Sequence, residues 1–197
     1  MQCTNSLKAV QIHFTTNGNN KILYLTVALL PVLLPFPFQW QYLPAALLPD
    51  QPYDAGGCWS GSATILSDGS PTLLYTGASR DGIQSQCQAH PEDPKDPFLV
   101  KWKKDPRNPV VLAPDGVNAS NFRDPTTGWV GGDGQWHVLV GARREGVDVA
   151  LVYESSDFRN WTMQTEPMRT APQRAGMWEV RAGSRVAFGW GFGWQRG

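Results

Sequence analysis

The chain has 197 residues, enough for one domain with a hydrophobic core or for part of a larger protein. Its 17 basic and 17 acidic residues cancel, so bulk electrostatics gives no reason to expect a nucleic-acid or acidic-lipid partner. The 20 Gly and 16 Pro residues follow no period, which favours many short strands and turns over long helices. All 17 acidic residues lie between residues 50 and 179, so the middle of the chain resembles a folded protein surface and the two ends do not.

Residues 1–40 are predicted to form an apolar leader. A polar, mildly basic start precedes residues 22–38, which are almost wholly apolar, and this order is typical of a secretory signal or a signal-anchor. The apolar run contains three prolines, which break helices, and its 17 residues are at the short limit for crossing a bilayer. A targeting segment and a leader from a misannotated gene model therefore both stay open. Contact with a membrane is expected only if the leader is a signal-anchor.

The three cysteines are Cys3, Cys58 and Cys87. Their spacing contains no Cys-x-x-Cys and matches no metal-ligand pattern, so the sequence predicts no metal site and no cofactor. An odd number excludes complete pairing within the chain. A disulfide between Cys58 and Cys87 is one alternative, and reduced thiols are the favoured one.

A β-hairpin is the clearest local prediction. Residues 59–66 alternate between apolar and polar side chains as a half-buried strand does, and residues 72–77 form the returning strand. Between them, residues 67–71 contain Asp-Gly, which accepts positive φ in a tight turn. The polar run at 80–98, rich in Pro and Asp, is predicted to be a long surface loop.

More short strands follow, separated by turns at 114–116, 131–134 and 143–147. The predicted strands lie at residues 98–103, 108–112, 126–130, 135–141 and 148–154. In the strand at 135–141, Trp136, Val138 and Val140 share one face. Turns every eight to twelve residues, with no helix longer than two turns within 40–179, indicate an all-β sandwich, barrel or propeller.

Residues 121–125, Asn-Phe-Arg-Asp-Pro, are the first candidate binding site. Arg123 donates hydrogen bonds in a planar fork and the Asp124 carboxylate accepts them, so together they could hold adjacent hydroxyls of a sugar. The alternative is a loop ion pair at an Asp-Pro turn.

Two further stretches carry candidate residues. Glu179 follows Trp178, and an adjacent indole could partly desolvate the carboxyl and raise its pKa, as general acid catalysis requires. The alternative is a surface Glu at a strand end. Trp59 and Ser60 offer a stacking face beside a hydroxyl, and here the alternative is a core Trp within the hairpin.

Taken together, residues 59–64, 121–127 and 177–179 resemble the ordered motifs of glycoside hydrolase family 32. That family comprises invertases, fructan exohydrolases and fructosyltransferases. The resemblance covers about residues 42–179. The connecting segments are similar to plant members at residues 48–54, 74–77, 93–97 and 151–158.

The resemblance implies a five-bladed β-propeller with its active site in the central funnel. Residues 41–179 would supply about two to three of these blades, and so an incomplete propeller. It also implies retaining hydrolysis or transfer at a β-fructofuranoside such as sucrose or a fructan. Glu179 matches the acid/base, and Asp124, beside Arg123, matches the transition-state stabiliser that holds fructose hydroxyls. Trp59 and Ser60 match residues that line the fructose subsite. Family members reside in the secretory pathway, in the vacuole or the cell wall.

The chain also departs from the family pattern. The nucleophile is expected in an Asn-Asp-Pro-Asn-Gly motif, which does not occur here, and Asp50 and Asp54 belong to a later element and do not replace it. Val180 stands where the family usually has Cys, and residues 180–197 form a divergent tail of Gly, Arg and Trp. We therefore expect a truncated or misassembled gene product without invertase activity. A non-catalytic fructoside-binding remnant and an unrelated all-β interaction module are the alternatives.

The resemblance to family 32 leads to one geometric prediction. Trp59, Asp124 and Glu179 should project from neighbouring blades into a single hollow of the size of a fructose ring. If these three side chains point to separate surfaces, the assignment to family 32 is contradicted.

Overall fold

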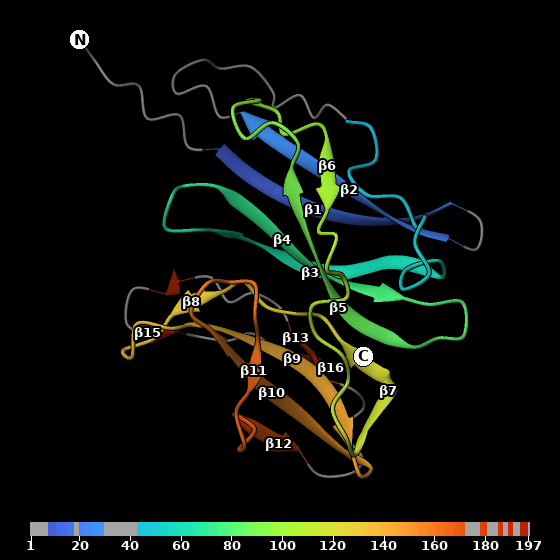
Figure 1. Cartoon of the computed structure of the whole chain (residues 1–197), viewed down its shortest axis with the longest axis vertical. Coiled ribbons are helices and arrows are strands. Elements are labelled where there is room, and N and C mark those ends of the chain that lie inside the picture. The colour runs from blue at the N-terminus through green and yellow to red at the C-terminus, as the bar shows by residue number, and fades with distance from the viewer. Residues whose placement is uncertain are drawn as a thin grey trace.

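The computed structural model describes residues 43–170 in full and, beyond them, only backbone strands that lie within residues 8–29 and 171–196 (Figure 1). Every regular element among these described residues is a β-strand, as predicted. No helix in the described part of the chain is long and apolar enough to cross a membrane.

Two antiparallel sheets make up the fully described region (Figure 1). The first sheet contains, in spatial order, β3 (Gly57–Ile65), β4 (Pro71–Ala78), β5 (Gln84–Pro91) and β6 (Trp102–Lys104). The second sheet has the order β11-β10-β9-β7, with β8 paired to β9 and β12 paired to β10. Its strands are β7 (Val117–Arg123), β8 (Trp129–Val130), β9 (Trp136–Arg144), β10 (Val147–Ser155), β11 (Thr162–Met163) and β12 (Arg169–Ala171).

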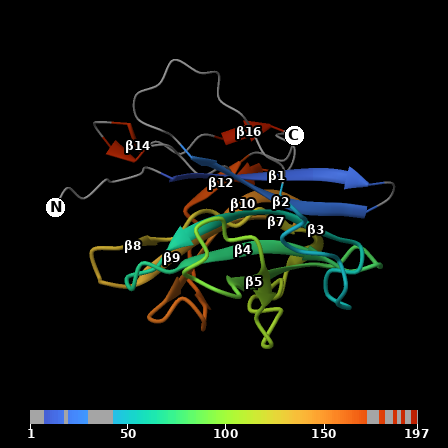
Figure 2. The same ribbon diagram turned by 90° about the horizontal axis from the view of Figure 1, so that it is seen from above.

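Three small antiparallel pairs accompany these sheets. They are β1 (Lys8–Asn17) with β2 (Asn20–Leu29), β13 (Trp178–Val180) with β16 (Trp194–Arg196), and β14 (Arg185–Val186) with β15 (Gly189–Trp190). The β1–β2 hairpin lies alongside β3 (Figures 1 and 2). Residues 30–40 of the predicted leader lie outside the described residues, so the boundaries of the leader and of the tail stay predictions.

The predicted hairpin at 59–77 is confirmed as β3–β4. Gly69 takes a φ of 82°, and the turn closes through a hydrogen bond from Leu66 N–H to Ser70 O (2.8 Å). Asp68 Oδ1 accepts from Ser70 N–H (2.8 Å), which fixes the turn further. The strands predicted at 135–141 and 148–154 are likewise confirmed as β9 and β10.

The prediction of a surface loop over residues 80–98 is wrong for residues 84–91, which form the largely buried strand β5. Gln84, Gln86 and Gln88 occupy alternate positions on one face of β5, and all three are buried. Their amide nitrogens all donate to backbone carbonyls outside the first sheet, as buried N–H groups generally do. The amide nitrogens donate to Ser120 O (2.7 Å), Phe122 O (2.9 Å) and Phe158 O (2.8 Å), respectively.

The prediction of a strand at residues 108–112 is also wrong. Only one isolated bridge, between Gln86 and Val111, occurs there. Backbone hydrogen bonds in this segment go to the polar strand β5, whose course the sequence pattern had not indicated.

Residues 43–170 form two main apolar cores, and the larger one takes in Leu74 of the first sheet as well as residues of the second. The larger core joins Phe122, Tyr153 and Phe158 to inward-facing residues of β9 and β10, including Val138 and Val140 as predicted. The smaller core contains Leu73, Tyr75, Cys58 and Cys87. Both of these thiols are reduced, which confirms the favoured alternative.

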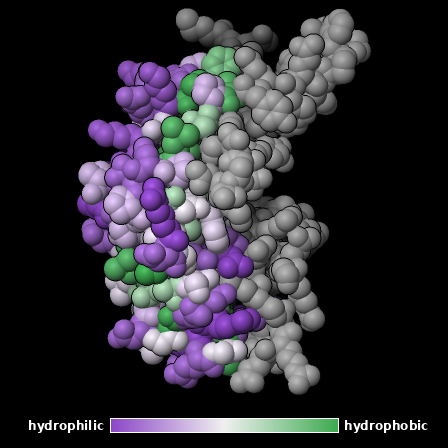
Figure 3. All heavy atoms as spheres, turned by 90° about the vertical axis from the view of Figure 1, so that its right-hand side faces the viewer, coloured by the Kyte–Doolittle hydropathy of each residue, from purple (hydrophilic) through white to green (hydrophobic). Residues whose placement is uncertain are grey.

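Exposed large apolar side chains are few and scattered among residues 43–170. In Figure 3, hydrophilic residues dominate the described part of the visible face, and hydrophobic residues occupy separate patches. Nothing on that part of the face suggests a large apolar docking surface.

Candidate functional site

Trp59 and Ser60 lie at a β-bulge in β3. Trp59 pairs with Thr76 on β4, whereas Gly61 pairs with Tyr75, so Ser60 is the extra residue without a partner in the ladder. A side chain at Gly61 could not fit, since a Cβ there would lie 2.2 Å from Leu74 O. The glycine therefore permits close backbone approach beside the bulge. Bulges of this kind re-aim side chains and occur often beside active sites.

Asp124 lies at a second irregularity, at the end of β7 and not at the head of a strand as predicted. Arg123 pairs with Gly141, while Thr126 and Leu139 exchange two hydrogen bonds, Thr126 N–H to Leu139 O (3.0 Å) and Leu139 N–H to Thr126 Oγ1 (2.9 Å). Between these two pairs the chain advances three residues on this side, from 123 to 126, and two residues on β9, from 141 to 139. This side therefore has one extra residue, as in a β-bulge.

The backbone of Asp124 takes an unusual conformation. Its φ of 63° is in the left-handed region, which Asp tolerates better than most residues other than Gly. The residue is 6% exposed. A buried residue held in this region motivates a functional hypothesis, because strain of this kind gathers at functional sites.

Thr76 connects the two irregular segments. The backbone N–H of Asp124 donates to Thr76 Oγ1 (2.9 Å), and Thr76 Oγ1 donates to Gln86 Oε1 (3.1 Å). Gln86 Nε2 then donates to Phe122 O (2.9 Å), which returns the chain of hydrogen bonds to β7. Thr76 is also the ladder partner of Trp59. Trp59 and Asp124, from different sheets, are thus fixed to the same residue of β4.

Comparison with known proteins shows the family of the chain. The family described as Glycosyl hydrolases family 32 N-terminal domain matches residues 38–186, three quarters of the chain. The chain belongs to glycoside hydrolase family 32. Its fold is therefore that of the family's N-terminal β-propeller, as the motifs predicted, while the number of blades stays a prediction.

Plant enzymes of family 32 are among the similar proteins. The chain is 44% identical over 140 residues to the vacuolar acid beta-fructofuranosidase 1 of a Rosa hybrid cultivar, covering 71% of this chain and 24% of that protein. It is 46% identical over 143 residues to an insoluble isoenzyme of beta-fructofuranosidase from Arabidopsis thaliana, with 71% and 24% covered. The chain thus spans about a quarter of the length of these relatives.

A solved structure of family 32 shares the fold. It is a variant of fructan 1-exohydrolase IIa from Cichorium intybus in complex with 1-kestose, with a TM-score of 0.76 and 38% sequence identity. The similarity covers 86% of this chain and 30% of that one.

The third family motif lies on a different element. Glu179 is the central residue of β13, where its backbone pairs with Gln195 of β16. The β13 backbone lies close to β9 and β10. The side chain of Glu179 is outside the described residues, so its convergence with Trp59 and Asp124 and the expected rise of its pKa stay predictions.

The carboxylate of Asp54 accepts hydrogen bonds from other residues of the protein. The residue is fully buried, and its Oδ1 accepts from Gln51 N–H (2.9 Å). Its Oδ2 accepts from Tyr75 OH (2.9 Å), Lys104 Nζ (2.6 Å) and Cys58 Sγ (3.6 Å). A carboxylate with both oxygens engaged inside the protein cannot reach a substrate. This geometry supports the expectation that Asp54 does not replace the family nucleophile.

The buried thiols are also poor nucleophiles. Burial raises the pKa of Cys58 far above its usual range, and burial raises the pKa of Cys87 to about 12. Both therefore stay protonated near neutral pH, and only a thiolate attacks readily.

An open cavity of about 550 Å³ lies beside the loop at 49–55. It is lined by Pro49, Asp50, Gln51, Pro52, Ala55, Ser79, Arg80 and Asp81. None of the predicted sugar-binding residues lines it, so the case for a sugar site rests on the junction at Thr76.

Thr76 and Gln86 are the site residues that sequence reasoning missed. Thr76 lies in the segment 74–77, whose likeness to plant family members was noted without a role for its hydroxyl. The alternation of glutamine at 84, 86 and 88 was a signal for a strand with one polar face.

Proposed function

We propose that this chain recognises the β-fructofuranosyl group of sugars such as sucrose, through a site derived from a retaining glycosidase. The observation that carries the proposal is the junction at Thr76, which fixes the family's Trp59 and Asp124 segments to each other. The carboxylate of Asp124 would accept hydrogen bonds from fructose hydroxyls, and Arg123 would donate them. Trp59 would offer its ring face and Ser60 its hydroxyl on the β3 side.

In the proposed reaction, charge would develop on the fructosyl ring as the glycosidic bond breaks. A carboxylate at the position of Asp124 would stabilise this positive, oxocarbenium-like charge. Glu179 would protonate the leaving oxygen and then, as a base, activate water or an acceptor hydroxyl.

The covalent step of a retaining mechanism needs a second carboxylate as nucleophile. The 197 residues contain no Asn-Asp-Pro-Asn-Gly motif, and the oxygens of Asp54 are engaged by other residues. Loss of a catalytic nucleophile typically reduces the rate by several orders of magnitude. We therefore propose that the 197-residue chain is inactive as a hydrolase, and a non-catalytic fructoside-binding remnant is the second candidate function.

Two measurements on the full 197-residue chain separate these functions. Calorimetric titration with fructose and sucrose, with maltose as a control without a fructosyl group, measures recognition. Fructose release from sucrose measures turnover. Binding without turnover supports the remnant. Turnover near that of a full-length relative contradicts the proposed inactivity, and absence of both binding and turnover contradicts fructoside recognition.

The names of the relatives bear on the route that the protein takes in the cell. Relatives of this chain are named vacuolar or insoluble beta-fructofuranosidases. We infer that the protein enters the secretory pathway, and the choice between vacuole and cell wall is a matter for direct localisation of a tagged chain.

A further inference from the structure

We propose that Asp133, His137 and Glu154 bind a divalent transition-metal ion such as Zn²⁺. One ligand atom from each of these side chains lies within 4.8 Å of the other two. They are the one such group among the residues whose side chains the structure describes. The proposed site belongs to the second sheet and is independent of the proposed recognition of fructosides.

Strand register brings the three residues together. His137 on β9 and Glu154 on β10 are directly opposed cross-strand partners, an arrangement that places side chains of one face in contact. Asp133 lies in the turn that precedes β9, and its two carboxylate oxygens are 3.1 and 3.2 Å from His137 Nε2. These separations match those between neighbouring ligands about 2.0–2.2 Å from a zinc ion.

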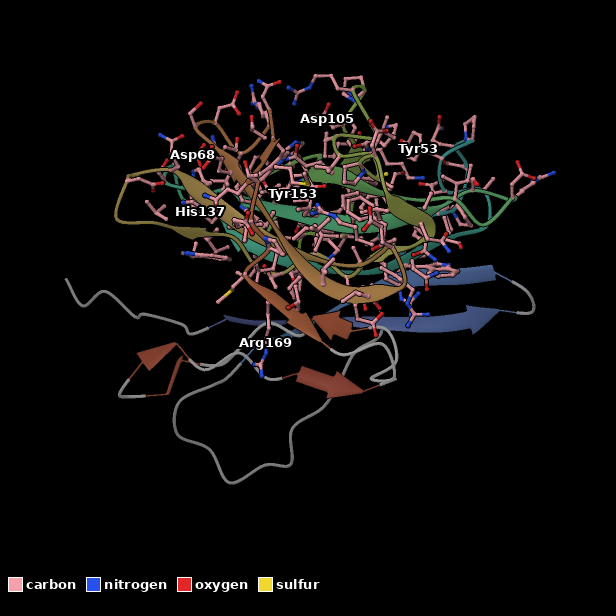
Figure 4. All side chains as sticks on the ribbon, turned by 90° about the horizontal axis from the view of Figure 1, so that it is seen from below. Tyr53, Asp68, Asp105, His137, Tyr153 and Arg169 are labelled. Carbon is pink, nitrogen blue, oxygen red and sulfur yellow. The ribbon has the colours of Figure 1, made fainter. Side chains whose placement is uncertain are left out.

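The imidazole is held in place by its surroundings. Trp129 stacks on it, with ring centroids 5.7 Å apart and an angle of 24° between the planes. Gly131 lets the turn approach, since a Cβ there would lie 2.6 Å from His137 Nε2. In Figure 4, His137 lies well away from Tyr53 and Asp105 across the molecule. The His137 side chain is 10% exposed and that of Asp133 is 49% exposed, so an ion could reach the site from solvent.

Both carboxylates have outer hydrogen-bond partners. Gln135 N–H donates to Asp133 Oδ1 (3.0 Å), and Gln164 Nε2 donates to Glu154 Oε2 (3.0 Å). Partners of this kind orient ligands at protein metal sites, and their loss commonly weakens metal binding.

The ligand chemistry selects the type of ion. One imidazole nitrogen and two carboxylates suit Zn²⁺, leaving a fourth position for water, and the two negative charges balance the ion. Mg²⁺ prefers oxygen ligands in octahedral geometry, so the imidazole disfavours it. We therefore expect Zn²⁺ to bind and Mg²⁺ to bind far more weakly.

The test is calorimetric titration of the full chain with Zn²⁺ and with Mg²⁺, after dialysis against a chelator. A Cys3→Ser background removes a thiol that lies outside the described residues. The expected result is saturation at one Zn²⁺ per chain, lost in His137→Gln and weakened about tenfold to a hundredfold in Gln164→Leu. Circular dichroism of each variant confirms that it folds.

His90→Gln is the matched control, because His90 also faces a carboxylate, with Nε2 3.4 Å from Asp105 Oδ2. No third ligand joins that pair among the described residues. The control should bind Zn²⁺ as the parent does. A parent that binds no Zn²⁺, or Zn²⁺ binding that His137→Gln leaves unchanged, would overturn the proposal. If His137→Gln does not fold, Glu154→Gln replaces it with the same expected loss.

Discussion

Asp54 and Asp124 are both buried carboxylates, but the structure fixes them in different ways. Asp54 is held through its side chain, whose oxygens accept hydrogen bonds from Gln51 in its own loop and from three residues of the first sheet. Asp124 is positioned through its backbone, by a left-handed φ and by the hydrogen bond from its N–H to Thr76. A side chain engaged by the protein's own donors stabilises the fold. A residue that is also fixed by its backbone keeps its position when its carboxylate binds a ligand.

The largest effect is expected at the ion pair of Asp54. Lys104 Nζ lies 2.6 Å from both Asp54 Oδ2 and Asp50 Oδ1. Burial lowers the pKa of Lys104, but hydrogen bonds to Asp50 and Asp54 outweigh this, so the pKa is raised and the ammonium stays charged. Lys104→Ala leaves a buried carboxylate uncompensated and should reduce the free energy of unfolding by about 3–5 kcal/mol. Urea unfolding followed by Trp fluorescence measures the change.

Lys103→Ala is the control for that substitution. Lys103 is the exposed neighbour of Lys104, and surface substitutions usually change stability by less than about 0.5 kcal/mol. Equal unfolding free energies for the two variants would show that Asp54 is not the structural centre that its contacts indicate.

The next effect is expected at Thr76. Thr76→Val keeps the shape of the side chain but removes the hydroxyl, which leaves the Asp124 N–H and Gln86 Oε1 without this partner. Each buried polar group left unsatisfied costs about 1–3 kcal/mol. Amide exchange measured by NMR should accelerate most at Asp124, and Thr76→Ser should restore protection. Unchanged exchange at Asp124 in Thr76→Val would refute the positioning role of the hydroxyl.

Asp54→Asn and Asp124→Asn test the comparison directly. Asp124→Asn should weaken the binding of fructose by about tenfold to a hundredfold, because a charge-assisted hydrogen bond contributes about 1.5–3 kcal/mol. It should change the free energy of unfolding less than Asp54→Asn does, since the backbone contact to Thr76 is retained. Titration calorimetry and urea unfolding on the same samples measure both quantities. Equal effects of the two substitutions on binding would remove the distinction between the residues.

Sequence patterns predicted those elements whose stabilising contacts are local. The β3–β4 and β9–β10 hairpins were predicted because alternation and turn chemistry are encoded within each segment. The polar strand β5 was missed because the partners of its glutamines are backbone carbonyls distant in sequence, at Ser120 and Phe122 of β7 and at Phe158 in the turn after β10. Such partners become visible only after the sheets are packed.

The candidate site was likewise predictable only in part. Motifs identified Trp59, Arg123 and Asp124 as candidates, but the attachment of Trp59 and Asp124 to Thr76 depends on the pairing of β3 with β4 and on a hydrogen bond between the sheets. The proximity of His137 and Glu154 similarly follows from the pairing of β9 with β10. Spacing along the chain does not encode either arrangement.

Asp157 extends the comparison to a carboxylate on the surface, and it has the smallest expected effect. Its Oδ1 accepts from the backbone N–H groups of Arg159 and Asn160, both at 2.8 Å, in the turn after β10. The hydrogen bond from Asn160 N–H is the main cause that lowers the pKa of Asp157 to about 2. Because the residue is exposed, solvent screening should limit its contribution to stability to less than about 1 kcal/mol.

The pH dependence follows from this lowered pKa. A carboxyl whose folded-state pKa is depressed contributes stability above its unfolded pKa of about 3.9, and the contribution is lost as the pH falls through about 2. Asp157→Asn should therefore flatten the decrease of the unfolding free energy between about pH 4 and 2. NMR titration of the Asp157 carboxyl measures the pKa directly, and a midpoint near 3.9 would contradict the prediction. A small effect here beside a large one at Lys104 would show that burial, more than the number of hydrogen bonds, makes Asp54 essential to the fold.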